Sequence, residues 1–184
     1  MEDLETKRYL IRTPEMKDAN EIYEKWGTDK EKMAEYKEHN KHKNIIETKA
    51  LLEAAMKEAE YGTPYWFIEE KENHNIVGYV KVPTASIKDK KCKVAFYFLE
   101  KWREDGTPQE VLKKVIEYLF KEKSIETIVM KFYAIDKEDT ELLDRILNII
   151  GMRREGILRN RLINSKGEKI NQYVYSILKE EYAK

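Results

Sequence analysis

The chain has 184 residues, and its 35 Lys and Arg residues balance 35 Asp and Glu residues. Its length suffices for one domain with a full hydrophobic core, and no Pro-, Gly- or Ser-rich stretch divides it, so we expect a single domain over residues 1–184. The balanced charge gives no global field that would recruit nucleic acid or an anionic membrane, so we expect neither as a partner. Because the chain shows neither a signal-peptide pattern nor an apolar stretch long enough to span a membrane, we expect a cytoplasmic protein.

Cysteine and histidine are too few and too scattered for the usual disulfide and metal patterns. Cys92 is the only cysteine, so no internal disulfide can form, and His39, His42 and His74 lack a recognisable metal spacing, so we expect no metal. Cys92 is either a nucleophile or a small core residue. Its strand-like surroundings contain no evident base, which favours the core.

Hydrophobic periodicity predicts the secondary structure, with a period near two for strands and near 3.6 for helices. Thr13-Pro14, Gly27, Gly62 and Gly151 are expected to end elements, and Asn44 to cap a helix. In chain order the expected elements are a strand at 4–12, a helix at 19–26, a helix at 45–61, strands at 65–68, 76–82 and 92–99, a helix at 111–120, a strand at 127–133, a helix at 142–150 and two strands at 152–164 and 169–178. This alternation of a strand meander with a strand-helix-strand unit predicts a mixed α/β sheet.

The segment Lys101–Glu110 joins the strand Cys92–Leu99 to the next helix. A helix N-terminus presents unpaired N–H groups and a positive dipole end, which suit an anionic phosphate, so this loop is a candidate phosphate site. A second interpretation needs no ligand. Thr107 as N-cap, Pro108 at the first helical position and Glu110 three residues after the cap form a capping box, which would make the loop a helix start only.

Leu4–Arg12 resembles the first strand, and Gly151–Gly156 and Tyr173–Ser176 resemble the closing hairpin, of the GNAT superfamily of acetyl-CoA-dependent N-acyltransferases. Within that superfamily the chain is similar to the branch that acetylates ribosomal-protein N-termini. The resemblance implies an α/β fold (α+β in some schemes) with a mixed, mostly antiparallel sheet of about seven strands flanked by helices. It also implies an N-acetyltransferase that uses acetyl-CoA as co-substrate and a small-molecule or peptide amine as acceptor, working as a monomer or homodimer.

The resemblance assigns the coenzyme to the loop, whose family pattern is Arg/Gln-x-x-Gly-x-Gly/Ala. Pro108 occupies the last small position and cannot donate an N–H, which removes a phosphate hydrogen bond worth roughly 1.5–3 kcal/mol. Glu104 and Asp105 add negative charge, which would repel the ligand unless their side chains point to solvent. The implied coenzyme contacts are the backbone at Phe98 and Leu99 for the pantetheine arm, then Arg103, Asp105, Gly106 and Thr107 for the pyrophosphate, with Thr140 as a helix N-cap or a further coenzyme contact.

The resemblance leaves the general acid and base open. Lys93 stands where many relatives carry a glutamate base, and Leu143 and Leu147 stand where relatives carry a serine and a tyrosine acid. His39 and His42 are either replacement bases or incidental residues of a solvated loop. The tyrosines that could supply a phenol acid, or could only pack in the sheet, are Tyr97, Tyr133, Tyr173 and Tyr175.

Two other functions stay open at this point. A GNAT-fold protein without catalysis could bind an acyl-CoA or a protein partner, and the residues at Lys93, Pro108, Leu143 and Leu147 favour that alternative. The other possibility is a domain whose assembly surface is its whole role.

Overall fold

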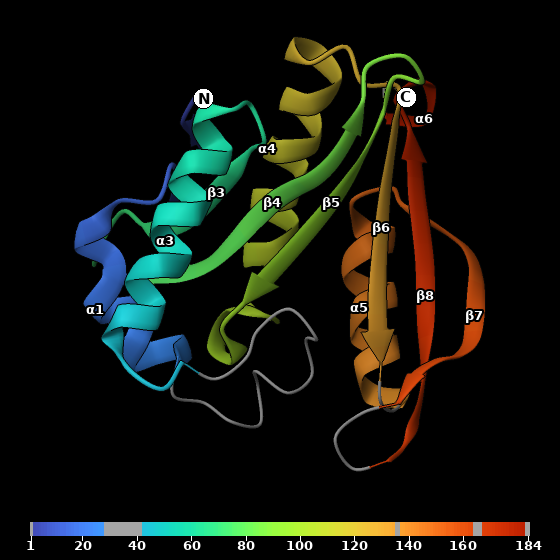
Figure 1. The fold of residues 1–184 in the computed structure, drawn as a ribbon. Coiled ribbons are helices and arrows are strands. Elements are labelled where there is room, and N and C mark those ends of the chain that lie inside the picture. The colour runs from blue at the N-terminus through green and yellow to red at the C-terminus, as the bar shows by residue number, and fades with distance from the viewer. Residues whose placement is uncertain (1, 28–41, 135–136, 164–166, 183–184) are drawn as a thin grey trace.

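The computed structural model describes residues 2–27, 42–134, 137–163 and 167–182 (Figure 1). The described strands form one sheet of eight, in the order β1-β2-β3-β4-β5-β6-β8-β7. All neighbouring strands in it are antiparallel except β5 and β6. The mixed, mostly antiparallel α/β architecture expected from the sequence is therefore confirmed.

The elements follow the expected chain order. The strands are β1 (Leu4–Glu5), β2 (Tyr9–Arg12), β3 (Tyr65–Glu70), β4 (Ile76–Ser86), β5 (Lys91–Phe98), β6 (Thr127–Ala134), β7 (Arg153–Ile163) and β8 (Lys169–Leu178). The helical segments are η1 (Met16–Asp18), α1 (Ala19–Ile22), η2 (Tyr23–Gly27), α3 (Ile45–Glu60), η3 (Glu100–Trp102), α4 (Thr107–Glu122), α5 (Lys137–Ile149) and α6 (Lys179–Tyr182).

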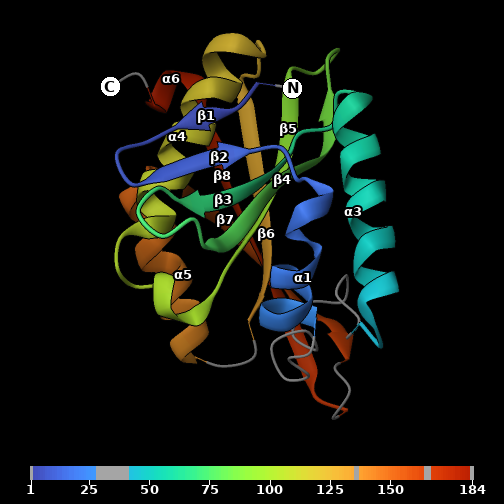
Figure 2. The same cartoon turned by 90° about the vertical axis from the view of Figure 1, so that its left-hand side faces the viewer.

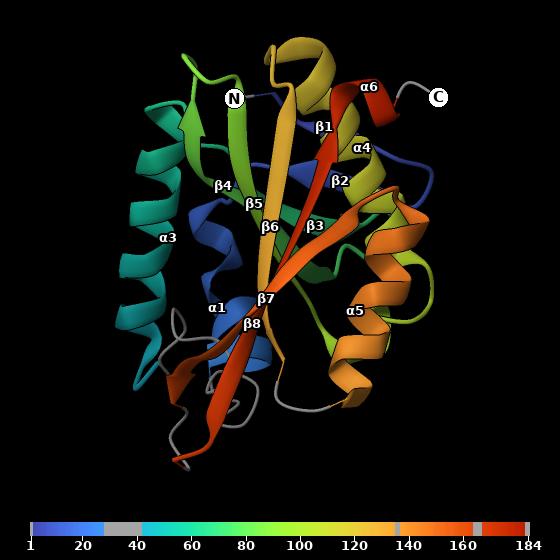
Figure 3. The same ribbon diagram turned by 90° about the vertical axis from the view of Figure 1, so that its right-hand side faces the viewer.

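Helices cover both faces of the sheet, α1 and α3 on one and α4 and α5 on the other (Figures 1 to 3). Strand β5 shows how the sequence achieves this. Val94 and Phe98 lie in the core cluster that contains α4 and α5, whereas Tyr97 lies in the cluster that contains α1 and α3. Successive side chains of a strand point to opposite faces, so a strand covered on both sides is a nearly continuous apolar run.

The prediction of one strand over Leu4–Arg12 is wrong, because the segment folds into a hairpin in which Leu4 pairs with Ile11. Thr6 closes the turn locally. Its backbone N–H donates to the Tyr9 carbonyl at 2.9 Å, and the Tyr9 N–H donates to the Thr6 hydroxyl at 3.0 Å. Short hydroxyl side chains of this kind satisfy nearby backbone groups and favour turns.

The cap at Asn44 is confirmed. The side-chain oxygen of Asn44 accepts the backbone N–H groups of Ile46 and Glu47, at 3.0 Å and 3.2 Å. These bonds satisfy two donors of the first turn of α3 that have no partner within the helix.

The two parallel strands β5 and β6 stay together only briefly. They pair from Lys91 with Thr127 to Lys93 with Val129, and beyond that point they diverge (Figure 1). An irregularity in the β4–β5 ladder, where Lys81 pairs with Ala95 and Thr84 with Lys93, lies at the same level. The segment after β5 and helix α5 after β6 therefore follow the diverging ends of the two strands.

Two further features concern only the described ranges. No helix there is long and apolar enough to cross a membrane. Within the same ranges, no group of three or more His, Cys, Asp and Glu side chains is arranged to hold a metal ion.

Candidate coenzyme site

The start of α4 differs from the predicted capping box. Gly106, not Thr107, is the N-cap, and it adopts a left-handed backbone with φ of 87°, which glycine reaches at no steric cost. Thr107 and Pro108 are the first two helical residues. The capping-box prediction is wrong because Asp105, two residues before the helix, supplies the carboxylate that caps it.

Asp105 fills the helix N-terminus with a carboxylate of the chain itself. Its Oδ1 accepts the backbone N–H of Thr107 at 2.9 Å and the Thr107 hydroxyl at 2.5 Å. Its Oδ2 lies 3.4 Å from Nη1 of Arg8 in the β1–β2 turn. The predicted coenzyme residue Asp105 is therefore placed at the loop, but as an acceptor rather than a donor.

Glu110 binds Arg8 instead of the cap. It accepts the backbone N–H of Arg8 at 2.9 Å, and its second oxygen lies 2.7 Å from the Arg8 Nε. Burial alone would raise the pKa of the Glu110 carboxyl, but these bonds lower the pKa overall. Arg8 thus fastens the loop and the first turn of α4 to the N-terminal hairpin.

Thr107 is 0% exposed, and its hydroxyl lies 2.6 Å from the hydroxyl of Tyr9. Both its hydroxyl and its N–H are used inside the protein, so a direct bond from Thr107 to a phosphate would require Asp105 to move. Pro108 has no N–H to offer. Among the first three helical residues, the backbone N–H of Gln109 is the donor that neither the helix nor Asp105 uses.

Arg103 lies folded over the end of β5. Its Nε donates to the carbonyl of Phe98 at 3.0 Å, and its guanidinium carbon lies 5.6 Å from the centre of the Tyr97 ring. Its Nη2 is buried without a hydrogen-bond partner in the described part of the chain. A buried guanidinium donor that is left unused suits an anionic ligand.

A cavity of about 450 Å³ lies between the loop and α5. Arg145 of α5 faces it, and its Nη2 is 2.9 Å from the carboxylate of Glu104 on the loop. The lining residues are Glu100, Arg103, Glu104, Glu138, Glu141, Leu142 and Arg145. The lining thus carries two guanidiniums against four carboxylates, and this excess of negative charge opposes an anionic phosphate.

Of the two β5 residues predicted to contact the pantetheine arm through their backbone, Phe98 directs its backbone groups away from β4 and Leu99 does not. The Leu99 N–H donates to the carbonyl of Val77 at 2.9 Å, so Leu99 still bonds β4. Neighbouring residues of an antiparallel ladder direct their backbone groups to opposite edges. The backbone of Phe98 therefore faces the diverging β6, with its carbonyl bonded to Arg103.

The predicted histidine bases fare differently. His39 lies outside the described residues. His42 is buried, its Nδ1 is 2.7 Å from the hydroxyl of Thr48, and burial lowers its pKa. His42 thus contacts the start of α3 as a buried structural residue, so the prediction of an incidental histidine in a solvated loop is wrong for it, and its position does not favour a base either.

The tyrosines lie mostly in packing positions. Tyr97 is 7% exposed, and its ring stacks on that of Tyr79 with centroids 5.9 Å apart. Tyr175 donates its hydroxyl to Asp144 at 2.7 Å, and burial together with this bond raises its pKa. Tyr133 and Tyr173 are half-buried.

The departures from the family pattern have physical roles of their own. Lys93 is exposed, Leu147 is fully buried in the core, and Leu143 packs partly buried against it. Thr140 lies inside α5, which begins at Lys137, so its predicted N-cap role is wrong because the helix starts earlier. In the described residues none of these four side chains is placed as an obvious proton acceptor.

Cys92 is a core residue. It is 3% exposed, and burial raises the pKa of its thiol to about 12. The nucleophile alternative is therefore not supported, since the thiolate is the reactive form.

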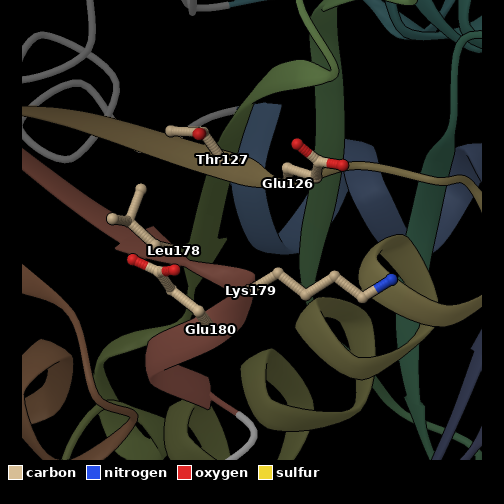
Figure 4. Close-up of a pocket in the computed structure, with 5 residues that line it drawn as sticks. All are labelled: Glu126, Thr127, Leu178, Lys179 and Glu180. Carbon is tan, nitrogen blue, oxygen red and sulfur yellow. The ribbon is translucent and has the colours of Figure 1, made fainter.

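A hollow at the opposite end of the sheet has no comparable chemistry (Figure 4). It measures about 440 Å³ and lies beside Glu126, Thr127 and the residues 178–180. The Lys179 side chain extends to α4 and donates to the Phe120 carbonyl at 2.7 Å, while Glu126 pairs with Lys90. The charged side chains that adjoin this hollow are thus largely used in structural contacts.

A family model described as an acetyltransferase (GNAT) domain matches residues 8–146. The chain belongs to the GNAT acetyltransferase family. As a member it is an acetyl-CoA-dependent N-acetyltransferase, as the resemblance implied. The Bacillus licheniformis protein named uncharacterized N-acetyltransferase p20 is 24% identical over 184 residues, which is 100% of this chain and 99% of that protein.

Solved GNAT structures share the fold. A GNAT-family acetyltransferase from Bacillus anthracis is 23% identical with a TM-score of 0.79, covering 98% of this chain and 100% of that one. A ribosomal L7/L12 alpha-N-protein acetyltransferase in complex with coenzyme A has a TM-score of 0.81 at 11% identity, covering 96% of this chain and 98% of that one.

Sequence reasoning missed Arg8 and Arg145. Arg8 contacts Glu110 across 102 residues, and no local pattern reports such a pair. Arg145 had a weak signal, because it is a basic residue in a helix that also carries Glu138, Glu141 and Asp144.

Proposed function

We propose that this acetyltransferase moves the acetyl group of acetyl-CoA to a primary amine, with the N-terminal α-amine of a polypeptide as the favoured acceptor and a small-molecule amine as the alternative. The observation that carries the proposal is the divergence of β5 and β6, which leaves the β6-facing backbone edge at Phe98 outside the ladder of the two strands. Beyond that edge, the loop carries Arg103, whose buried Nη2 has no hydrogen-bond partner among the described residues. The similar fold of a protein in complex with coenzyme A supports the same ligand here.

The chemistry demands little from side chains. The acetyl-CoA supplies a thioester; a neutral amine attacks its carbonyl carbon, the C–S bond breaks, the coenzyme leaves as a thiolate and the new amide loses a proton to water. A backbone N–H on the β6-facing edge of β5 can polarise the carbonyl oxygen. The chain therefore contributes mainly position, which can supply a large part of the rate enhancement.

Among the described residues, no side-chain base lies at the family's base position, which favours an α-amine acceptor. At pH 7 about one in seven α-amines is neutral, because their pKa is near 7.8, whereas roughly one lysine in 2,500 is neutral at a pKa near 10.4. In this enzyme, the exposed Lys93 occupies the family's base position and the buried Leu147 its acid position. An acceptor amine that is already neutral needs no base to remove its proton, so it should react faster.

The test combines binding and transfer. Acetyl-CoA at a hundred times its dissociation constant should stabilise the protein by about 2.7 kcal/mol in thermal unfolding. Transfer is followed by release of the coenzyme thiol and by mass spectrometry, with a peptide bearing a free N-terminus and the same peptide bearing an acetylated N-terminus and an internal lysine. Absence of both a thermal shift at millimolar acetyl-CoA and thiol release with any amine would overturn the proposal. Preference for the blocked, lysine-containing peptide would overturn the α-amine assignment.

A further inference from the structure

The outer strand of the sheet carries arginines that the candidate coenzyme site does not use. β7 is the outermost strand beside β8 (Figure 3), and its 11 residues include four arginines and one glutamate. The two at its start, Arg153 and Arg154, each form an ion pair of 3.0 Å, with carboxylates of α6 and α5. The two near its far end, Arg159 and Arg161, are exposed and have no ion-pair partner among the described residues.

Arg159 and Arg161 line a hollow of about 850 Å³, which we call the β7 hollow. The remaining residues of its lining are Ile157, Leu158, Asn160 and Asn171. Ile157 is 44% exposed and Leu158 is 46% exposed, so apolar surface lies beside the two guanidiniums. Among the lining residues the charge is entirely positive, which suits an anionic occupant with some apolar surface of its own.

The β7 hollow lies at a bulge of the strand. Between the β8 residues Ile170 and Gln172, which both pair with β7, three β7 residues lie opposite a single β8 residue. Asn160, in the middle of the bulge, has a left-handed φ of 50°, and its N–H donates to the side-chain oxygen of Asn171 at 3.0 Å. A bulge with two arginines interrupts regular edge-to-edge pairing of two β7 strands, because like charges would meet there. A second copy of the chain is therefore a poor occupant.

The β7 hollow lies at the same level of the sheet as the proposed reacting edge. The parallel strands β5 and β6 pair at Lys93 and Val129. Phe98 and Ala134 lie equally far beyond that pair, and Ala134 pairs with Asn171 in the lining of the hollow. Neighbouring strands lie about 4.8 Å apart, so β7 lies about 10 Å from β6. An extended chain covers about 3.3 Å per residue, so a polypeptide with its amine at Phe98 reaches β7 with about its fourth to eighth residues.

We propose that the β7 hollow binds an acidic segment of a polypeptide acceptor, at about the fourth to eighth residue from its N-terminus. Carboxylates of that segment pair with Arg159 and Arg161, and its apolar groups contact Ile157 and Leu158. This inference rests on the proposed function and narrows its acceptor to acidic polypeptides, because a small amine at Phe98 is too short to reach β7.

The experiment compares two peptides of equal length with free N-termini, one carrying Glu and the other Gln at those positions. We expect the acidic peptide to have a kcat/KM about fivefold higher, through a lower KM at unchanged kcat, because the contacts lie away from the reacting atoms. The double variant Arg159→Ala, Arg161→Ala should abolish this preference and leave kcat/KM for the Gln peptide at the wild-type value. The matched control Lys57→Ala, Lys88→Ala removes two exposed charges of α3 and the β4–β5 turn and should keep the preference.

The preference should also shrink as the salt concentration rises from about 0.05 M to about 0.5 M, since exposed charges are screened. Equal kcat/KM for the two peptides with the wild-type protein would overturn the inference and leave the proposed function in place. An equal loss of preference in the lysine control would overturn it as well. A wild-type dimer that the arginine variant dissociates, seen by sedimentation, would assign the hollow to a second copy and overturn it. A wild-type protein that acetylates neither peptide nor any other amine would overturn both proposals.

Discussion

Asp105 gives the most direct test of the loop, because its carboxylate stands where an anionic ligand of the α4 N-terminus would bind. Asparagine keeps an oxygen that can accept the Thr107 N–H but removes the charge. The lost ion pair with Arg8, formed by partly exposed side chains, is worth about 0.5 kcal/mol. The lost interaction with the helix dipole is worth about 0.3–1 kcal/mol. We expect Asp105→Asn to destabilise the free protein by about 1 kcal/mol in total.

The same substitution should tighten coenzyme A. For an assumed separation of about 7 Å, a carboxylate and a phosphate charge repel by roughly 0.6–2.4 kcal/mol for effective dielectric constants between about 80 and 20. Removing that repulsion corresponds to about three- to fiftyfold tighter binding. Calorimetry with coenzyme A measures the gain, and thermal unfolding without ligand should show a melting temperature about 2–4 °C lower.

Asp105→Ala is the matched control for this substitution. It removes the acceptor as well as the charge, so it should show the same gain in coenzyme affinity with a further loss of about 1 kcal/mol in stability. The reasoning is refuted if Asp105→Asn binds coenzyme A no tighter than the wild-type protein. Weaker binding would instead support direct contact between Asp105 and the coenzyme, as the family resemblance implied.

Three further outcomes are expected. Arg12→Ala should lower the free energy of unfolding, measured with urea, by about 3–5 kcal/mol, because it leaves the buried carboxylates of Asp18 and Glu69 without their guanidinium partner. A decrease of less than about 1 kcal/mol would contradict this. Burial alone would raise the pKa of Glu69, but the bonds from His74 and Arg12 lower it overall. Because the folded pKa lies below the unfolded one, the stabilisation from this carboxylate is complete above about pH 4.5 and is lost as the pH falls through the folded pKa. Unfolding curves measured at about pH 7 and below about pH 4 should show this loss of stability. Finally, if only the neutral α-amine of a peptide reacts, kcat/KM should rise tenfold per pH unit up to the amine's pKa, about 7.8. A plateau that begins at about pH 6.5 would instead indicate a histidine base, and the His39→Ala variant would then test that residue.

The order of the helices and strands was predictable, because an element buried on one face shows apolar residues at its own helical or strand period, and a strand buried on both faces shows a continuous apolar run. Continuous apolar runs predicted β3 and β5, and amphipathic periods predicted α4 and α5. The split of Leu4–Arg12 into two strands was missed because so short a segment does not fix a period. The hairpin puts Leu4 on the same face as Ile11, whereas in one continuous strand these two residues, an odd number of positions apart, would point to opposite faces. The local bonds of Thr6 close the turn.

The candidate site was predictable in position but not in detail. The loop after β5 follows from a buried strand that runs into a helix. The sequence suggested Thr107 as the side chain that caps α4, whereas the structure uses the carboxylate of Asp105, and contact with Arg8, about a hundred residues away in sequence, helps to hold Asp105 in place. Contacts of that kind are set by tertiary packing, which local capping rules do not contain.

Under the proposed function, the carboxylates of the loop would repel the phosphates, a part of the coenzyme that does not react. The phosphates keep their charge while the thioester bond at the other end breaks, so Asp105 and Glu104 would weaken binding of the coenzyme in the ground state and in the transition state alike. Uniform changes of this kind alter KM and kcat/KM but not kcat. We therefore expect the Asp105→Asn, Glu104→Gln double variant to show a lower KM for acetyl-CoA at unchanged kcat, in initial rates at saturating amine. Because Arg103 joins this loop to the Phe98 carbonyl at the reacting edge, a changed kcat would show instead that the loop charges reach the acetyl group through that arginine.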